Sequence, residues 1–247
     1  MPRPSTYAPE SPDYITINEY KTSNEIGMWV DTPPMPPMAE QVYREISIPG
    51  REEKLVVADN EYKDIPLAVK AYIFDNAYDL TAVYTWLRGT TKLRFNDDDY
   101  YYRVKQVKPP TLNYKGHGKT MITLNFVVSP FRYIKPDTIV ISTDTTFTVQ
   151  NLGNIYCRPR YKIYGSGTLT LRVDNDTNNQ LKITGVDEYV IVDAERMLVY
   201  KDSTFLSSEG VIPFLDVGAS EVKVLPQSSM QGDVFSKIEI MRNQRVV

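Results

Sequence analysis

Most of the chain alternates apolar and polar residues, which is the pattern of β-strands with one buried face. In the first half the alternation is clearest over residues 122–128, and residues 42–48 and 68–74 have the same period. Two apolar stretches flank the polar residues 96–99, and together they predict a β-hairpin over residues 93–104. We therefore predict a first half that consists mainly of strands.

Only one segment has helical periodicity. Its apolar residues recur at the three- and four-residue spacing of one helix face, and they are Leu80, Val83, Tyr84 and Leu87. Asp79 precedes them as an N-cap residue, and Gly89 follows them where a left-handed residue commonly ends a helix. Because this helix is so short, we expect it to be held by packing on a sheet.

The second half consists of short apolar stretches separated by turn residues, so it is predicted to be all-β. A polar segment with a proline, residues 132–137, separates it from the first half. Gly165 and Gly167 lie between two of its strands, and we interpret them as a tight hairpin turn. The strands recur at the spacing of a β-sandwich. They are residues 139–142, 145–149, 160–164, 169–173, 181–184, 190–193, 197–200, 222–225 and 236–242.

Prolines and a charged loop mark the exposed parts of the first half. Prolines cluster in residues 2–12 and 33–37, which we expect to form extended arms. Residues 48–63 are predicted to form a loop in which a charged run meets an apolar patch. That mixture favours a strand that lies on a neighbouring subunit, and an ordinary long hairpin is the alternative. The predicted intersubunit arm consists of Arg51, Glu52, Glu53, Lys54, Leu55, Val56 and Val57.

The amino-acid composition argues against several classes of function. The 247 residues include 28 Lys+Arg and 31 Asp+Glu, and this balance leaves no basic excess for nucleic acid or an anionic membrane. No window approaches the ~20 apolar residues that span a bilayer. One Cys and one His cannot form an internal disulfide framework or a zinc site of Cys and His ligands. The 18 tyrosines, in contrast, suit strands and protein interfaces.

Three short motifs resemble ligand sites, and a turn explains each of them better. Gly118-Lys119-Thr120 matches the end of a phosphate-binding loop, but a strand follows it instead of a helix. The acidic residues 97–99 are candidate glycosidase carboxylates, yet neighbours on a strand point to opposite faces. Residues 174–178 begin like a calcium loop but lack its Gly and its Glu, so weak calcium binding stays an alternative. We expect no metal site and no cofactor.

Nucleophilic catalysis also has little support. Cys157 and His117 are the only thiol and the only imidazole, and no motif around Cys157 would activate it. Serine hydrolysis would require His117 as base and a G-x-S-x-G motif, which is absent. We therefore expect an inert cysteine, no catalytic residues and no enzymatic activity.

An ordered set of loose motifs spans nearly the whole chain. In the first half they are Ile48-Pro-Gly-Arg51, Tyr62-Lys-Asp-Ile65, the helix with Trp86-Leu87 and the acidic hairpin with its tyrosines. In the second half they are residues 149–154, 158–171, 189–196, 213–222 and 238–245. In this order and spacing the chain resembles the distal tail proteins of long non-contractile-tailed (siphovirus-type) bacteriophages and their prophage relatives.

The resemblance implies a fold and a place in a virion. Residues 1–134 would form a ring-forming N-terminal β-sandwich with one short helix and extended arms. Residues 135–247 would form a galectin-like β-sandwich. Its last strand could instead pack with the N-terminal domain. The protein would be a structural hub of the phage tail tip, or baseplate, assembled in the host cytoplasm.

The resemblance also implies partners. The first is the protein itself, in a ring expected to be a homo-hexamer. This ring would connect the tail tube protein to the tail-associated hub or lysin protein and would dock host-adsorption proteins. The tape measure and receptor-binding proteins are further candidates, whereas no nucleic-acid specificity and no membrane are expected.

Two other functions compete with this one. The first is a galectin-like carbohydrate-binding module in which Trp29 or Trp86 stacks on a sugar ring, although Trp86 lies beside the apolar helix face and fits a core better. Family members that bind host saccharides carry large inserted carbohydrate modules, and this chain has no room for one. The second, a glycosidase with Asp97 or Asp99, is the weakest.

Overall fold

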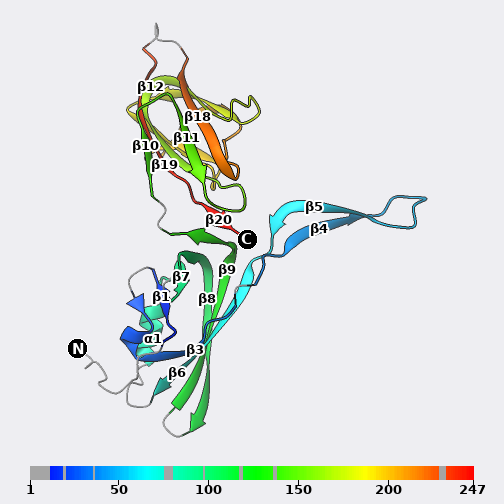
Figure 1. Ribbon diagram of the computed structural model, residues 1–247, viewed down its shortest axis with the longest axis vertical. Helices are drawn as coiled ribbons and strands as arrows, with labels where there is room; N and C mark the ends of the chain where they lie inside the picture. Colours follow the sequence, from blue (N-terminus) through cyan, green and yellow to red (C-terminus); the bar gives the residue numbers. More distant parts are fainter. Residues whose placement is uncertain are drawn as a thin grey trace. The chain divides into compact units, whose positions relative to one another are not determined.

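The chain divides into two compact units, Met1–Arg132 with Val247, and Tyr133–Val246. Both are built from antiparallel strands, so the protein is mainly β, as its alternating pattern predicts (Figure 1). Among the residues described below, α1 (Leu80–Leu87) is the one α-helix, and no helix is long and apolar enough to cross a membrane. The computed structural model describes residues 12–18, 21–35, 37–74, 80–96, 98–116, 119–135, 138–227 and 232–247.

The first unit contains one large sheet, with the strand order β2-β1-β7-β8-β9-β6-β3. The predicted hairpin over 93–104 is confirmed, because Leu93 pairs with Tyr102 across β7 and β8. Residues 122–128 are likewise strand, in the middle of a longer β9. The strands are β1 (Ile15–Ile17), β2 (Lys21–Thr22), β3 (Met28–Thr32), β6 (Ile65–Phe74), β7 (Lys92–Phe95), β8 (Tyr100–Gly116) and β9 (Lys119–Ile134).

The pairing of β6 with β9 shows how alternation builds the core of this unit. Leu67 lies opposite Phe126, and Val69 lies opposite Leu124. Because side chains alternate between the two faces of a strand, all four point to the same face, and all four are buried. Burying an apolar side chain of this size contributes about 1.5–3 kcal/mol. The sheet is therefore held by its inward-facing residues.

Helix α1 packs on this core through a face slightly different from the predicted one. Val83, Trp86 and Leu87 are buried, but Tyr84 is 47% exposed, so its predicted place on the buried face is wrong. Trp86 takes that place on the buried face: its side chain is buried, and its indole Nε1 donates a hydrogen bond to the carbonyl oxygen of Lys21 at 3.2 Å. Gly89 has φ of +73° just beyond the helix, as expected for a helix end. Asp79 lies outside the described residues.

Residues 48–63 form the turn and the returning strand of a hairpin, which is the alternative given above for this segment. β4 (Gln41–Ile46) and β5 (Leu55–Tyr62) form a separate two-stranded antiparallel sheet, with Ile46 opposite Leu55 (Figure 1). The β-branched and apolar residues that open β5 favour this conformation. Only the segment around Gly50, whose φ is +84°, is a turn. Pro49 and Gly50 thus lie in the turn that joins the end of β4 at Ile46 to the start of β5 at Leu55.

The second unit has two layers that share one core. One layer has the order β10-β19-β12-β14-β15-β16, and the other joins β11, β18, β12, β13 and β17. Buried residues from both layers belong to a single hydrophobic cluster, which is the arrangement of a β-sandwich. The strands are β10 (Val140–Ser142), β11 (Thr146–Asn151), β12 (Arg160–Val173), β13 (Gln180–Val186), β14 (Tyr189–Asp193), β15 (Leu198–Lys201), β16 (Thr204–Phe205), β17 (Ser207–Gly210), β18 (Gly218–Pro226), β19 (Val234–Met241) and β20 (Arg245–Val246).

The predicted hairpin at Gly165 and Gly167 is also wrong. β12 runs straight through both glycines, pairing with β14 and β19 before them and with β13 and β18 after them. The glycines let one strand pass from one layer to the other, because Gly167 has φ of +84° and a Cβ on Gly165 would stand 2.1 Å from the carbonyl oxygen of Val234. They mark a crossing point of the sandwich.

Candidate functional site

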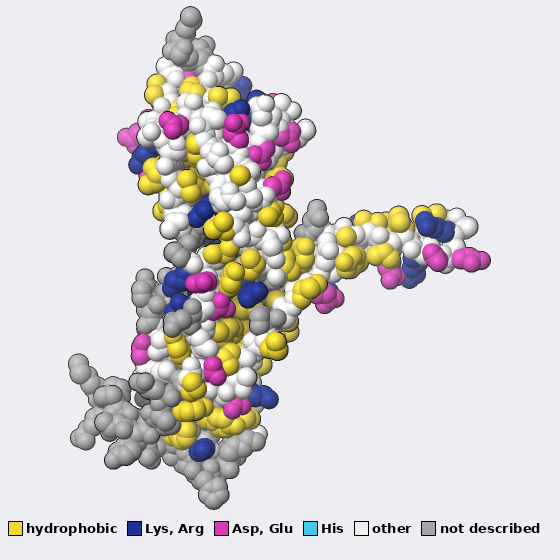
Figure 2. All heavy atoms as spheres, viewed as in Figure 1, with side chains coloured by type: hydrophobic (Ala, Val, Ile, Leu, Met, Phe, Trp, Pro, Cys, Tyr) yellow, Lys and Arg dark blue, Asp and Glu magenta, His cyan; other side chains and the backbone are white. Residues whose placement is uncertain are grey.

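The β4–β5 hairpin exposes apolar side chains on both of its faces. Leu55, Val56 and Val57 are consecutive and are 40%, 58% and 39% exposed. Since consecutive strand residues point to opposite faces, apolar side chains are exposed on both faces of the hairpin. Tyr43 and Ile46 on β4 are exposed as well. Figure 2 shows hydrophobic side chains along the hairpin, with charged ones at its tip.

Polar contacts hold the two strands of the hairpin together. Lys54 forms a salt bridge of 2.6 Å with Glu45, and Arg44 forms one of 3.2 Å with Asp59. Exposed ion pairs contribute only about 0–1 kcal/mol each, and a two-stranded sheet is marginal in water on its own. A hairpin with uncovered apolar faces and weak internal support is suited to being stabilised by a partner.

The tip of the hairpin has unused acidic groups. Arg51, Glu52 and Glu53 are exposed, and their side chains make no hydrogen bond or ion pair within the described structure. The amide of Arg51 donates to the carbonyl oxygen of Ile48 at 3.1 Å, which closes the turn. Because Lys54 is engaged by Glu45, the free charges of the tip are two carboxylates and one guanidinium. Of the seven predicted arm residues, the first four, Arg51 to Lys54, lie in the turn, and the last three, Leu55 to Val57, begin β5.

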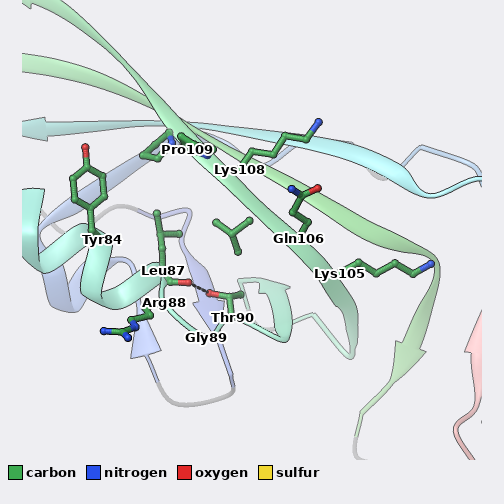
Figure 3. A pocket seen from close by; sticks show the side chains of 11 residues that line it. Tyr84, Leu87, Arg88, Gly89, Thr90, Lys105, Gln106, Lys108 and Pro109 are labelled. Carbon is green, nitrogen blue, oxygen red and sulfur yellow. Dashed lines mark hydrogen bonds between the residues drawn. The ribbon is translucent and has the colours of Figure 1, made fainter.

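A groove lies beside α1, on the same unit as the hairpin (Figure 3). Its volume is about 520 Å³, and its walls are the end of the helix and the middle of β8. Apolar side chains from both elements face it, among them Leu87 and Pro109. The hydroxyl of Thr90 donates to the carbonyl oxygen of Leu87 at 2.7 Å and fixes the chain where it leaves the helix.

The charged residues of the groove are all cations. Arg88 lies on the helix side and Lys105 and Lys108 on the strand side (Figure 3). Lys105 is bound to Asp64 at 2.5 Å, whereas the side chains of Arg88 and Lys108 have no ion-pair partner in the described part of the chain. Sequence reasoning missed this site. Its residues come from segments about twenty positions apart, and only the packing of α1 beside β8 brings them together.

The other sequence candidates do not assemble into a site. Asp97, His117 and Gly118 lie outside the described residues, and Lys119 begins strand β9. Asp98 accepts a hydrogen bond from the amide of Tyr100 at 3.3 Å, as a turn residue does. Trp86, offered for sugar stacking, is only 4% exposed.

The acidic turn and the cysteine of the second unit also have structural contacts. Asp174 accepts a hydrogen bond from the amide of Glu221 at 2.7 Å, and Asp176 accepts one from the amide of Asn178 at 2.8 Å. Cys157 is fully buried and pairs with Leu215 through backbone hydrogen bonds of 2.9 and 3.1 Å. Over the residues that the structure describes, no three His, Cys, Asp or Glu side chains are grouped to hold a metal ion.

A row of lysines and tyrosines crosses one face of the second unit. Lys162 lies 4.9 Å from the ring of Tyr164 and 4.5 Å from that of Tyr189, and Lys237 lies 4.2 Å from the ring of Tyr164. A hydrogen bond to Tyr164 raises the pKa of Lys162, and one to Glu239 raises that of Lys237. Alternation alone places 162 and 164 on one face. The partners across the strands depend on a register that the sequence does not reveal.

Comparison with known proteins shows which solved structure has the same fold as this chain. No protein-family model and no curated protein matches the chain. Among solved structures, the chain has the fold of a bacteriophage hub protein. That protein is the Dit protein (gp 19.1) of SPP1, described as a paradigm of the hub adsorption apparatus in phages that infect Gram-positive bacteria. The similarity has a TM-score of 0.65 at 14% sequence identity, and it covers 92% of this chain and 97% of that one.

Proposed function

We propose that the protein is a distal tail protein, a structural hub of a siphovirus tail tip. The single observation that carries this proposal is the fold shared with SPP1 Dit over nearly the full length of both chains. The hub would be a homo-hexameric ring that joins the tail tube protein to the tail-associated hub or lysin protein. It would also dock host-adsorption proteins and act without catalysis.

Within this proposal the two halves have different tasks. Residues 1–134 form the ring, and residues 135–247 form a peripheral galectin-like sandwich. The hairpin residues Arg51 to Val57 lie on the neighbouring subunit. Three features support the last point: the apolar side chains of β5 are exposed on both faces, the ion pairs within the hairpin are weak, and the acids at its tip have no partner in the described structure.

The test is the mass of the purified protein by light scattering after size-exclusion chromatography. A ring gives a multiple of 28.3 kDa, and a hexamer gives six times that mass. In the deciding variant, Asn-Gly replaces residues 45–56, so that Arg44 and Val57, which pair across the hairpin, are joined by a two-residue turn. We expect a folded monomer, as judged by circular dichroism and a cooperative melt. A wild-type monomer at all concentrations would contradict the ring, and an intact ring in the variant would contradict the arm.

A further inference from the structure

We propose that the groove beside α1 receives the hairpin tip of a second copy of this chain, with Glu52 and Glu53 facing Arg88 and Lys108. This inference rests on the proposed arm and adds its acceptor. It joins two surfaces of the same unit that have complementary charge and complementary apolar content.

The acids of the tip and the cations of the groove are opposite in charge. Besides the guanidinium of Arg51, the tip has two carboxylates without partners, and the groove has two cations without partners, in the part of the chain that the structure describes. Charge-assisted pairs between Arg or Lys and carboxylates strengthen when water is partly excluded, and complementary patches fix the register of an interface. Contact between the two surfaces would give each of these four groups an opposite charge.

Two other pockets of the protein fit an acidic tip less well. The pocket around Arg132 is also lined by Asp98, and the pocket that contains Arg172 and Lys182 is also lined by Glu209. In both, an acid of the chain itself already stands beside the cations. The groove at α1 has three cations and no acid in its lining; Asp64, outside the lining, pairs with Lys105, and Arg88 and Lys108 keep no ion-pair partner in the described part of the chain.

The groove and the hairpin also both present apolar side chains. The groove has Leu87, Val107 and Pro109 between its cations. Directly after the acidic tip, Leu55 and Val56 are 40% and 58% exposed. An apolar segment that follows two acids thus meets an apolar floor flanked by cations, which removes exposed apolar surface on both copies from water.

The groove and the projecting hairpin lie on different sides of the first unit. Figure 1 shows α1 on the side of the first unit away from the direction in which β4 and β5 project. The hairpin therefore carries its tip away from the groove of its own chain. A contact between two different patches on opposite sides is heterologous, which is the type of contact that generates a ring when the rotation closes.

A reciprocal charge exchange tests the pairing in the full-length protein. Glu52→Lys with Glu53→Lys places cations at the tip, and Arg88→Glu with Lys108→Glu places acids in the groove. Each double variant should raise the concentration at which the ring dissociates by at least about tenfold, and the quadruple variant should restore it toward the wild-type value. A matched control is Lys182→Glu with Arg196→Glu on the second unit, which makes the same charge change and should leave the ring intact.

The outcomes separate this inference from the proposed function. If shortening the hairpin dissociates the ring while both charge-reversed variants assemble normally, the arm stands and this acceptor is wrong. If the shortened hairpin leaves the ring intact, the arm fails and the acceptor fails with it. Failure of the quadruple variant to regain assembly, with each variant folded by circular dichroism, would also overturn the pairing.

A crosslink provides a second measurement that does not depend on charge reversal. With Glu53→Cys and Lys108→Cys in one chain, mild oxidation should give covalent oligomers between copies, and each single variant should give none beyond background. The native Cys157 is fully buried and leaves the two introduced thiols as the accessible ones. A ring whose double variant stays monomeric on denaturing gels would show that the tip lies elsewhere.

Discussion

The hydroxyl of Tyr161 donates a hydrogen bond to the carbonyl oxygen of Pro213 at 3.2 Å inside the core of the second unit. Tyr161 is fully buried, and this burial raises its pKa well above the ordinary value for tyrosine. Tyr102 in the first unit is nearly as buried, but its hydroxyl has no partner among the described residues. The two tyrosines therefore differ in one hydrogen bond.

Replacing each of these tyrosines with phenylalanine should give different results. Tyr161→Phe removes a donor and leaves the Pro213 carbonyl unpaired in the core, so we expect the free energy of unfolding to fall by about 1–3 kcal/mol. Tyr102→Phe removes a buried hydroxyl that has no partner, so stability should stay the same or rise slightly. Urea denaturation of both variants measures the difference, and equal losses would contradict it.

The crossing of β12 between layers makes Gly167 sensitive to substitution. A Cβ there would stand 2.0 Å from a carboxylate oxygen of Asp233, in a backbone with φ of +84°. Gly167→Val should lower the melting temperature of the second unit by several degrees and leave ring formation unchanged.

Gly185→Ala is the matched control, because Gly185 has φ of +75° but nothing within 4 Å of its Cβ position. It should cost only the backbone strain, about 1–2 kcal/mol. Loss of the ring in Gly167→Val without loss of stability would place this segment at an interface.

Local periodicity predicted those elements whose partners lie nearby in the chain. The hairpin over 93–104 and the helix ending before Gly89 depend on spacing, turn residues and caps, which are properties of short segments. The mainly β class follows from the same alternation. For these elements the local preferences and the final packing agree.

The prediction failed where packing between distant segments decided the structure. Gly165 and Gly167 read as a turn, yet β12 continues because other strands pair with both of its ends. Tyr84 fits the helical spacing, but the buried residue is Trp86, which bonds to Lys21, a residue distant in the sequence. The groove joins Arg88 to Lys108 only in the folded unit. No local pattern contains this information.

Two residues of α1 separate the stability of the helix from the proposed docking. Trp86→Ala removes a side chain that is 4% exposed and should reduce the free energy of unfolding by about 3–5 kcal/mol. Tyr84→Ala removes one that is 47% exposed and lines the groove, so stability should change little while ring assembly weakens. Thermal melts and light scattering at several concentrations measure the two effects. A Tyr84→Ala variant that assembles like the wild type would argue against contact at this wall of the groove.

The salt bridge between Lys237 and Glu239, at 2.8 Å, gives the second unit a dependence on acid pH. A hydrogen bond from Lys237 lowers the pKa of Glu239 below its ordinary value. A carboxylate with a lowered pKa in the folded state adds stability that is present above the ordinary carboxyl pKa and is lost as the pH falls through the lowered one.

Glu239→Gln should therefore lower the melting temperature slightly at pH 7, and the difference from the wild type should disappear in acid. The effect is small because solvent screens this exposed pair. Melting curves at neutral and acid pH measure it. A difference between Glu239→Gln and the wild type that stays constant with pH would mean that the side chain acts through packing and not through its charge.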